Sequence, residues 1–474
     1  MEIGKKEDPK GYPLEEITIG GKVGESMKED ANKLMKRIGI LCAAVILAGV
    51  LALAELGSGR QEQITSSLVE SETVYLILAL CLAVVLALVG LTVSVILSAL
   101  PVLKRLKLPK RPRRGSGPRF PGLSQIDREQ KKQTPTSYED PSLAEICSRL
   151  REYAAGQLGL YYDISDIRRF VAGLGMGRLM ILRGMSGTGT TSLAYVAGQF
   201  FGNPSAIVPV QPMWKERSDL LGYFNEFTKR FNETPLLCKL YEAGGSEDIY
   251  IIVLDEVNIS RIEYYFAEFL SLLEIPDPEK RELEIVSDTW DGDPQRLVRG
   301  KLRLPQNVWF IGTANNDDST FAISDKVYDR AAVLDLEKKS APFAAKPTEA
   351  ARISWTALEG RFRDARQRYS LSKEGRERIE KLDEYLSRVF RVSFGNRIRR
   401  QLEEYVPVMI ACGGTEEGAM DDILARKILR KLEQLSPVLL RNEIPALVGV
   451  LDTLFGQDAL PLSREYLDGL SRRT

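Results

Sequence analysis

The chain has 474 residues, 44% of them hydrophobic and 27% charged, which is the composition of a globular protein long enough for two or three domains. Its 65 basic and 65 acidic residues balance, so the overall charge does not indicate a nucleic-acid-binding protein. The absence of histidine excludes histidine-based proteases, histidine metal sites and phosphohistidine chemistry, and it leaves carboxylates, hydroxyls, Lys and Arg for catalysis.

Two long apolar runs follow the first 37 residues. They occupy residues 38–56 and 73–100, and each is long enough for a membrane-spanning helix, which needs about 20 mostly apolar residues. Basic residues flank the pair on both outer sides, whereas the loop between the runs carries mainly glutamates. The positive-inside rule therefore predicts a two-span transmembrane hairpin at 38–100, with residues 1–37 and the rest of the chain in the cytoplasm.

Residues 101–141 are rich in Pro, Lys, Arg and Gly, a composition that predicts a linker. Its basic half is expected to bind anionic lipid headgroups, at about 1 kcal/mol for each cation near the surface. Nucleic acid is the alternative partner for these charges. No other sequence motif supports it.

Residues 184–192 read GMSGTGTTS and match the phosphate-binding loop G-x-x-x-x-G-K-[ST] except at the lysine, which is Thr190. A buried strand is predicted before the loop at 178–183, and a helix is predicted after it, ending at Gly202. We expect ATP or GTP to bind here, with Mg²⁺ on the Thr191 hydroxyl. The predicted binding residues are Gly184, Ser186, Gly187, Thr188, Gly189, Thr190, Thr191 and Ser192.

Two further apolar strands end in polar residues. The run 249–258 ends near Asp255 and Glu256, and the run 307–319 contains Asn315. Ligands of α/β sheets bind at the carboxyl ends of the strands. Asp255 is therefore a predicted Mg²⁺ ligand, Glu256 a predicted base that polarises water, and Asn315 a predicted contact of the γ-phosphate. The alternative is a strand end made soluble by acidic residues.

Arg330 precedes another apolar strand and has two interpretations. It either pairs with Asp329 or Asp325, or it acts as an arginine finger on the phosphate of a neighbouring subunit. The stretch 279–307 is predicted to form a β-hairpin with a polar tip. The hairpin is either a substrate contact or an ordinary surface feature.

The order of these motifs, together with W-x(4)-D-L-L-G-Y at 214–223, resembles the AAA+ ATPases of the McrB-like, dynein-related branch over residues 145–470. The resemblance implies an α/β fold with a parallel sheet between helices at 142–340, and a helical lid and C-terminal helical region at 341–474. It also implies a homo-oligomeric ring that uses ATP and Mg²⁺ to remodel a partner protein. Asn315 would be the first sensor, Arg330 the finger acting in trans and Arg397 the second sensor. A solvated basic helix face explains Arg397 as well.

Thr190 leaves two functions open. Losing the lysine removes a charge-assisted contact worth roughly 1.5 to 3 kcal/mol, or about one to two powers of ten in affinity. In the first hypothesis another basic residue, such as Arg183 or an arginine of a neighbour, replaces the lysine and the protein hydrolyses ATP. In the second, the protein is a hydrolysis-deficient nucleotide-binding scaffold or sensor.

Overall fold

The computed structural model describes residues 117–131, 137–184, 187–315, 320–336 and 340–473, together with Ala83, Ala87 and Gly90. The chain divides into two units, Met1–Arg113 and Arg114–Thr474, and the fold below is that of the second unit. Apart from those three residues, the predicted hairpin at 38–100 lies outside the described residues. Within the described part, no helix combines the length and the apolar character needed to cross a bilayer.

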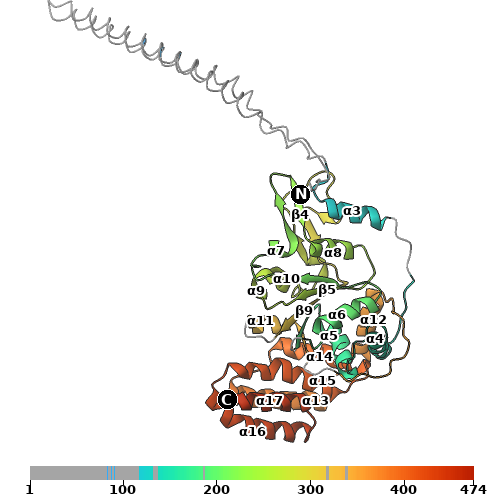
Figure 1. Ribbon diagram of the computed structural model, residues 1–474. Helices are drawn as coiled ribbons and strands as arrows, with labels where there is room; N and C mark the ends of the chain where they lie inside the picture. The colour runs from blue at the N-terminus through green and yellow to red at the C-terminus, as the bar shows by residue number, and fades with distance from the viewer. Residues whose placement is uncertain are drawn as a thin grey trace, which may run out of the picture. The chain divides into compact units, whose positions relative to one another are not determined.

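Ten strands and a larger number of helices make up the described part of the second unit (Figure 1). The strands are β1 (Leu179–Gly184), β2 (Ala206–Pro209), β3 (Gly222–Asn225), β4 (Arg230–Glu233), β5 (Tyr250–Asp255), β6 (Glu282–Glu284), β7 (Leu297–Val298), β8 (Lys301–Arg303), β9 (Val308–Asn315) and β10 (Ala332–Leu336). The helices up to β10 are α3 (Pro121–Gln130), α4 (Leu143–Leu158), α5 (Ile164–Met176), α6 (Thr190–Phe200), α7 (Arg217–Leu221), α8 (Pro235–Ala243), α9 (Ile262–Tyr265), α10 (Ala267–Leu272), η1 (Pro278–Lys280) and α11 (Asp325–Tyr328). The later helices are α12 (Trp355–Arg368), α13 (Lys373–Phe390), α14 (Asn396–Ala411), α15 (Glu416–Ile423), η2 (Leu424–Ile428), η3 (Leu429–Gln434), α16 (Pro437–Phe455) and α17 (Pro461–Arg473).

The central sheet has five parallel strands in the order β10-β1-β9-β5-β2. Strand β9 therefore lies between β1 and β5, although it comes last of the three in the chain. Gly184 at the end of β1 pairs with Asn315 at the end of β9, and Leu254 near the end of β5 pairs with Gly312. The carboxyl ends of these three strands consequently meet at one edge, as the sequence predicts.

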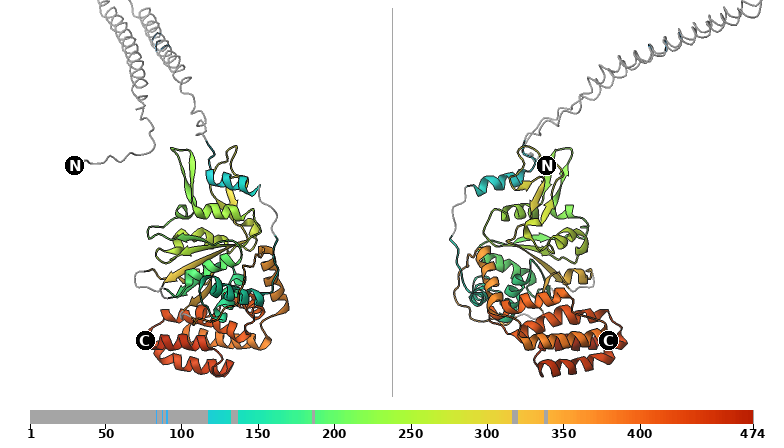
Figure 2. Two further views of the ribbon diagram at one scale, coloured as in Figure 1. Left: turned by 45° about the vertical axis from the view of Figure 1, so that its right-hand side comes forward. Right: turned by 180° about the vertical axis from the view of Figure 1, so that it is seen from behind.

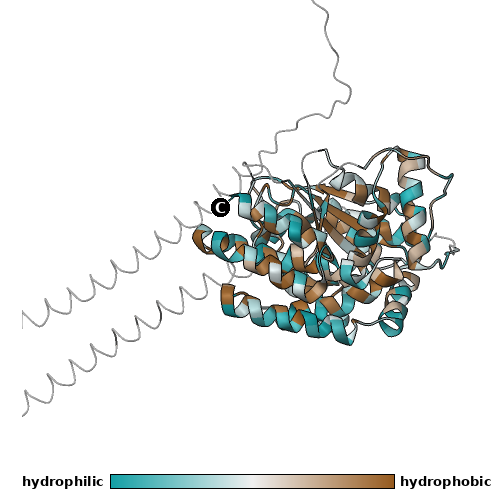
Figure 3. Cartoon of the chain, turned by 90° about the horizontal axis from the view of Figure 1, so that it is seen from below, coloured by the Kyte–Doolittle hydropathy of each residue, from teal (hydrophilic) through white to brown (hydrophobic). Residues whose placement is uncertain are grey.

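The central strands are apolar on both sides, because each face of the sheet is covered by a hydrophobic core. Successive side chains of a strand point to opposite sides, and Leu182 and Val253 pack into one hydrophobic core while Ile181 and Ile252 pack into the other. Helices α4, α5 and α6 and the C-terminal helices complete the first core, and α8, α9 and α10 complete the second. The strands and inward helix faces are accordingly coloured as apolar in Figure 3. The predicted α/β layering is present.

Two further groups of elements lie at opposite ends of the unit. Figures 1 and 2 show α3, β3 and β4 at one end of the unit, and α13, α16 and α17 gathered at the opposite end. Strands β3 and β4 form an antiparallel hairpin. No strand pattern in the sequence indicates this hairpin, and β3 begins inside the 214–223 motif.

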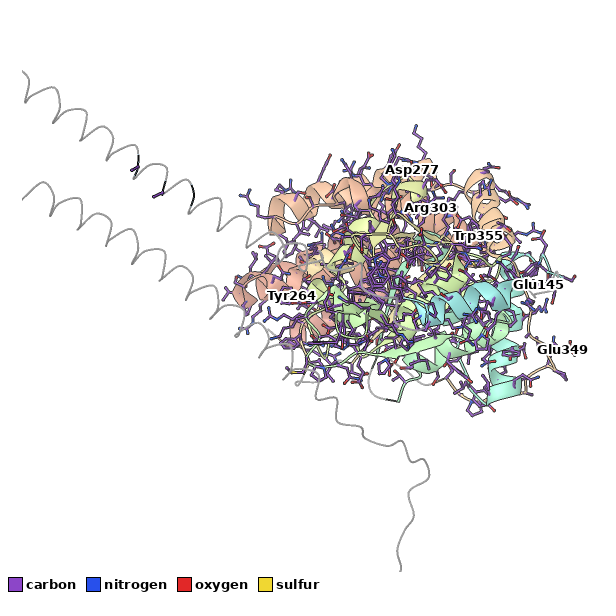
Figure 4. The ribbon with its side chains drawn as sticks, turned by 90° about the horizontal axis from the view of Figure 1, so that it is seen from above. Glu145, Tyr264, Asp277, Arg303, Glu349 and Trp355 are labelled. Carbon is purple, nitrogen blue, oxygen red and sulfur yellow. The ribbon has the colours of Figure 1, made fainter. Side chains whose placement is uncertain are left out.

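The predicted hairpin at 279–307 is a three-stranded antiparallel sheet. Strand β8 pairs with both β6 and β7. Arg299 and Gly300 join β7 to β8 with positive φ angles of 54° and 76°, the backbone of a tight two-residue hairpin turn. Residues 261–274 contain the two short helices α9 and α10. Tyr264 of α9 is 57% exposed and lies at the margin of the folded unit (Figure 4).

Part of the predicted linker 101–141 is folded. Phe120 and Leu123 are fully buried, and the Phe120 ring stacks on Phe231 with a centroid distance of 5.1 Å. Glu233 accepts hydrogen bonds from the first-turn N–H groups of α3, at Gly122 (2.7 Å) and Leu123 (2.9 Å). A few apolar residues in a polar stretch are therefore sufficient to dock it, because the β3–β4 hairpin supplies the partner surface.

Candidate nucleotide-binding site

The phosphate loop connects β1 to α6. Gly187 and Gly189 have φ angles of 83° and 94°, a left-handed backbone that favours glycine. Gly189 stands at the N-cap of α6 and has no side chain with which to cap the helix, so the first-turn N–H groups are open to an anion. Ser192 belongs to this first turn, whereas Ser186 lies outside the described residues.

The loop is tightly closed around Gly184. A Cβ atom at Gly184 would lie 2.3 Å from Thr188 Oγ1, 2.7 Å from the Leu336 carbonyl oxygen and 3.2 Å from the Thr190 methyl group. Thr190 is only 8% exposed, and its methyl group therefore turns into the protein. Tyr162 closes the loop on another side, because its hydroxyl donates to the Gly189 carbonyl at 3.0 Å. The Thr190 side chain therefore does not reach outward to the phosphates, as the lysine of a standard phosphate-binding loop would.

Thr191, Asp255 and Thr313 form a continuous hydrogen-bonded group. The Thr191 hydroxyl donates to Asp255 Oδ1 at 2.8 Å, and the Thr313 hydroxyl donates to the same oxygen at 2.7 Å. Two residues predicted to bind Mg²⁺ are therefore in direct contact. The contact fixes the Asp255 carboxylate against the start of α6.

Glu256 follows Asp255 with a left-handed backbone, φ 56°, which is uncommon for a residue with a side chain. Its N–H donates to Thr313 Oγ1 at 2.9 Å, and its side chain is exposed at the sheet edge. Such strain collects at functional sites when the surroundings hold it in place. The backbone turn places an exposed carboxylate beside the loop.

Asn315 ends β9 opposite Gly184 and is half-buried. Its carbonyl accepts a 2.8 Å hydrogen bond from the Asn258 amide, which ties the end of β9 to the segment after β5. The structure thus brings together the loop, Asp255, Glu256 and Asn315, as expected from the sequence.

The donor set fits Mg²⁺. This ion prefers oxygen ligands and is bound through one or two carboxylates together with phosphates and water. Thr191 and Asp255 supply a hydroxyl and a carboxylate side by side. No cluster of three or more Cys, Asp or Glu side chains suited to a metal occurs among the described residues.

The Arg183 guanidinium is paired elsewhere and is not directed at the phosphate loop. Its Nε and Nη2 bind the two oxygens of Asp335 at 2.6 and 3.0 Å, and Arg426 adds a contact to Asp335 at 3.1 Å. Burial would raise the pKa of Asp335, but Arg426 and Arg183 hold it below its usual value. Bidentate pairs of this kind are strong. The hypothesis that Arg183 replaces the lysine is therefore not supported.

A cavity of about 960 Å³ borders the Arg183 and Asp335 pair, with Asp163, Arg426 and Arg464 also in its wall. Most lining side chains are charged, whereas pockets for small molecules are lined mainly by apolar groups. The cavity therefore gives no support to a particular nucleotide base.

Arg330 and Arg397 lie together but away from the loop. Both bind Glu274, Arg330 through Nη2 at 2.6 Å, in place of the expected pairing of Arg330 with Asp325 or Asp329. Ala332, two residues after Arg330, pairs with Met180 at the amino end of β1. The phosphate loop follows the opposite end, at least about 13 Å along the strand at 3.3 Å per residue. The structure does not bring either arginine to this chain's own phosphate loop.

The sequence interpretation missed three residues of the site. Thr313 is 3% exposed and lies in an otherwise apolar strand. Because a buried hydroxyl needs a hydrogen-bond partner, a threonine in such a strand indicates a polar contact. Asn258 joins β5 to β9, and Tyr162 closes the loop from before α5. Tyr162 carries no local signal, because it lies 27 residues from Gly189.

Comparisons with known proteins give limited similarity. No family model matches the chain, and no curated protein matches it. A crystal structure of a "putative ATPase" from Cytophaga hutchinsonii is 13% identical with a TM-score of 0.41, covering 69% of this chain and 95% of the other. A full-length MCM homolog from Methanopyrus kandleri is 13% identical with a TM-score of 0.35, covering 62% of this chain and 64% of the other. Both TM-scores are below 0.5, so neither structure establishes the family of this chain.

Proposed function

We propose that the chain is a membrane-anchored AAA+ protein, related to the McrB-like branch, that binds ATP or GTP with Mg²⁺ and hydrolyses it in a homo-oligomeric ring. The contact between Thr191 and Asp255, beside the open first turn of α6, carries this proposal. Motif order in the sequence supports the family, and the exposed Glu256 carboxylate supports hydrolysis.

Each residue has a defined task in this proposal. The N–H groups at Gly189 and the first turn of α6 hold the phosphates, and Thr191 and Asp255 hold the metal. The metal nucleotide supplies the phosphoryl group and neutralises charge that develops on it. Glu256 orients the attacking water and accepts its proton, and Asn315 positions the terminal phosphate.

The membrane part of the proposal is supported by the sequence. Two apolar runs at 38–56 and 73–100 and the basic residues from 104 to 114 favour an anchor that rests on anionic lipid. We infer that the ring remodels or organises a partner protein at this membrane. Only the basic residues of the 101–141 segment favour nucleic acid, so no role on nucleic acid is proposed.

A second function is a nucleotide-binding scaffold that does not hydrolyse. Two observations favour it. Thr190 turns into the protein, and Arg183 is engaged by Asp335, so neither supplies the missing charge at the phosphates. Binding would then rest on backbone amides and the metal, weakened by about one to two powers of ten.

The test compares the full-length chain with three variants in detergent solution, measuring ATP and GTP affinity and turnover. Thr190→Lys restores the charge, Glu256→Gln removes the water-polarising carboxylate, and Thr191→Ala removes the metal ligand. Turnover in the natural chain that Glu256→Gln abolishes supports hydrolysis. Binding without turnover, with turnover restored by Thr190→Lys, supports the scaffold. Nucleotide binding that Thr191→Ala leaves unchanged contradicts both functions.

A further inference from the structure

An aromatic side chain projects from the tip of the β3–β4 hairpin. Residues 226–229 connect the two strands, and Phe227 among them is 98% exposed, more than any other large hydrophobic residue in the described part of the chain. Single exposed apolar side chains are common on protein surfaces, so exposure alone assigns no role. Phe227 is distinguished by the turn that holds it and by the chain that enters the folded unit beside it.

The tip is a preformed turn. The Asn225 side chain accepts hydrogen bonds from the N–H groups of Phe227 at 2.9 Å and Thr228 at 3.1 Å. Asparagine closes turns in this way, by bonding to the backbone two residues further on. Lys229 has a left-handed backbone, with a φ angle of 55°, and its ammonium group donates to Glu226 at 2.6 Å. A contact made by Phe227 therefore needs little ordering of the turn, which lowers the entropic cost of binding.

The strands below the tip are packed against other parts of the unit. Phe224 of β3 lies opposite Phe231 of β4, and its ring contacts Trp290 with a centroid distance of 5.7 Å. The Arg119 guanidinium lies 4.8 Å from the Phe224 ring centroid. The hairpin projects from the end of the unit that carries α3 (Figure 2). Its packed base therefore supports a tip that faces outward.

The chain enters the folded unit at this tip. The Arg119 carbonyl accepts a backbone hydrogen bond from Phe231 at 2.8 Å, and further along, Glu233 accepts from the first turn of α3. The segment before α3 thus runs along β4 from the tip toward the base of the hairpin. At the start of this segment, a Cβ atom on Gly117 would lie 2.8 Å from Arg230 Nη2. The chain that precedes Gly117 consequently leaves the unit beside the tip.

Chain length connects this point to the lipid surface. The basic residues that we propose rest on anionic lipid end with Arg114, three residues before Gly117. A chain spans at most about 3.3–3.6 Å per residue, so Gly117 stays within about 11 Å of Arg114. Phe227 precedes Arg230, the neighbour of Gly117, by three residues, which is again about 11 Å or less. The tether therefore keeps the hairpin tip within reach of the headgroups that Arg114 contacts.

We propose that the tip of the β3–β4 hairpin is a second membrane contact, in which Phe227 inserts into the headgroup layer of an anionic bilayer. Aromatic rings bind at this depth, and neighbouring cations favour anionic lipid. Phe227 supplies the ring, and Arg230 and the basic residues up to Arg114 supply the charge. The inference rests on the membrane anchor of the proposed function, because the tether brings the tip to the surface. It gives the folded unit one defined side that faces lipid.

The first experiment measures the depth of the tip in a bilayer. The full-length chain is reconstituted in vesicles of phosphatidylglycerol and phosphatidylcholine, with and without bromine on the acyl chains close to the headgroup. Phe227→Trp is the reporter, and the fluorescence of the natural chain, which has four tryptophans, is subtracted. Bromine should quench this reporter. Bromine near the end of the acyl chains should quench it less, because interfacial burial reaches only about 5–10 Å.

The matched control is Val438→Trp. Val438 is 70% exposed on α16, which lies at the opposite end of the unit from α3 and β4 (Figure 1). It therefore reports an exposed apolar position that the tether does not bring to the bilayer. Bromine at either depth should leave its fluorescence unchanged.

A second measurement removes the ring without adding a reporter. In the same vesicles, hydrogen exchange of residues 225–230 should be at least about tenfold faster in Phe227→Ser than in the natural chain, because burial of the phenylalanine ring favours docking by that factor or more. Val438→Ser should leave exchange at the tip unchanged. Flotation of the Phe227→Ser chain with the vesicles should also be unchanged, since the two predicted spans remain. This comparison decides the question if Phe227→Trp fails to fold.

Three results overturn the inference. The first is equal quenching of Phe227→Trp and Val438→Trp. The second is a blue shift of Phe227→Trp emission without quenching by bromine, which would mean that a second copy of the chain covers the ring. The third is tip exchange that Phe227→Ser leaves unchanged. Failure of the proposed anchor gives a different result, because the natural chain would then not float with the vesicles.

Discussion

The Thr191 hydroxyl lies 2.8 Å from Asp255 Oδ1, which joins the start of α6 to the end of β5 across 64 residues of sequence. An ordinary glycine- and threonine-rich turn does not require a hydrogen bond between its last hydroxyl and a carboxylate at the end of a neighbouring strand. The contact distinguishes the loop from such a turn even though Thr190 replaces the lysine. Metal-dependent binding is therefore the property to test first.

Thr191→Ala should weaken nucleotide binding at least about tenfold when Mg²⁺ is present, because a ligand of the metal is lost. Thr191→Ser keeps the hydroxyl and should stay within about threefold of the natural chain. Titration with a fluorescent ATP analogue, with Mg²⁺ and with a chelator, measures both. Equal affinities of the alanine and serine variants in Mg²⁺ would exclude Thr191 as a ligand.

Arg183→Met should destabilise the protein without changing nucleotide affinity. The Asp335 carboxylate would keep only Arg426, and breaking a buried pair costs about 3 kcal/mol or less when one partner remains. Urea unfolding measures this loss. Arg217→Met, at an exposed pair, should cost less than about 1 kcal/mol. A loss of affinity with unchanged stability would instead mean that Arg183 serves the phosphates.

Lys427 should make stability depend on pH. Burial lowers its pKa from 10.5 to about 7 in the folded protein. Between these values the unfolded chain holds a proton that the folded chain has released, so this group's contribution to stability rises with pH. The unfolding free energy of the natural chain relative to Lys427→Met should increase by about 2 kcal/mol from about pH 7 to about pH 9.

Urea unfolding at the two pH values measures this difference. The unfolding free energy of the natural chain minus that of Lys427→Met should rise with pH. A difference that is constant, or that falls with rising pH, would contradict a buried lysine with a lowered pKa.

Arg119→Met should loosen the attachment of α3, because it removes the contacts of the segment before α3 with Asp288 and Trp290. The guanidinium lies 4.3 Å from the Trp290 ring centroid and 2.7 Å from Asp288 Oδ1, with 4% of the side chain exposed. Losing both contacts should cost about 2–4 kcal/mol. Hydrogen exchange over 117–131 should rise strongly in this variant. It should stay unchanged in Arg128→Met, whose side chain is exposed on α3. Equal exchange in both would show that Phe120 and Leu123 hold α3 alone.

The strands and the phosphate site were predictable because their signals are local. The apolar runs that form β1, β5 and β9 end in the residues that we propose bind the nucleotide, and parallel strands bring those ends together. Charge partners are not local. Arg183 pairs with Asp335, which is 152 residues away in the sequence, and Arg330 pairs with Glu274, which is 56 residues away. No local pattern favours these partners over acidic residues that are nearer in the sequence.

The packing of short segments could not be predicted from the sequence either. Phe120 lies in a stretch whose composition predicts a linker, and its partner Phe231 belongs to a hairpin that local patterns do not indicate. Next to the break between α9 and α10, Tyr265 and Phe266 are buried and Tyr264 is exposed. Helical periodicity alone cannot distinguish these neighbours.

The docking of α3 has a mechanical consequence. A pulling force applied to the chain before Gly117 enters the folded unit at Arg119 and Phe120 and is carried into the β3–β4 hairpin and the segment at Asp288. The load reaches the parallel sheet mainly through α8, because α3 packs on α8 and β4 and α8 in turn packs on β2. Tension on the N-terminal side would therefore act first on the small hairpin and α8, and would reach the candidate nucleotide site only through them.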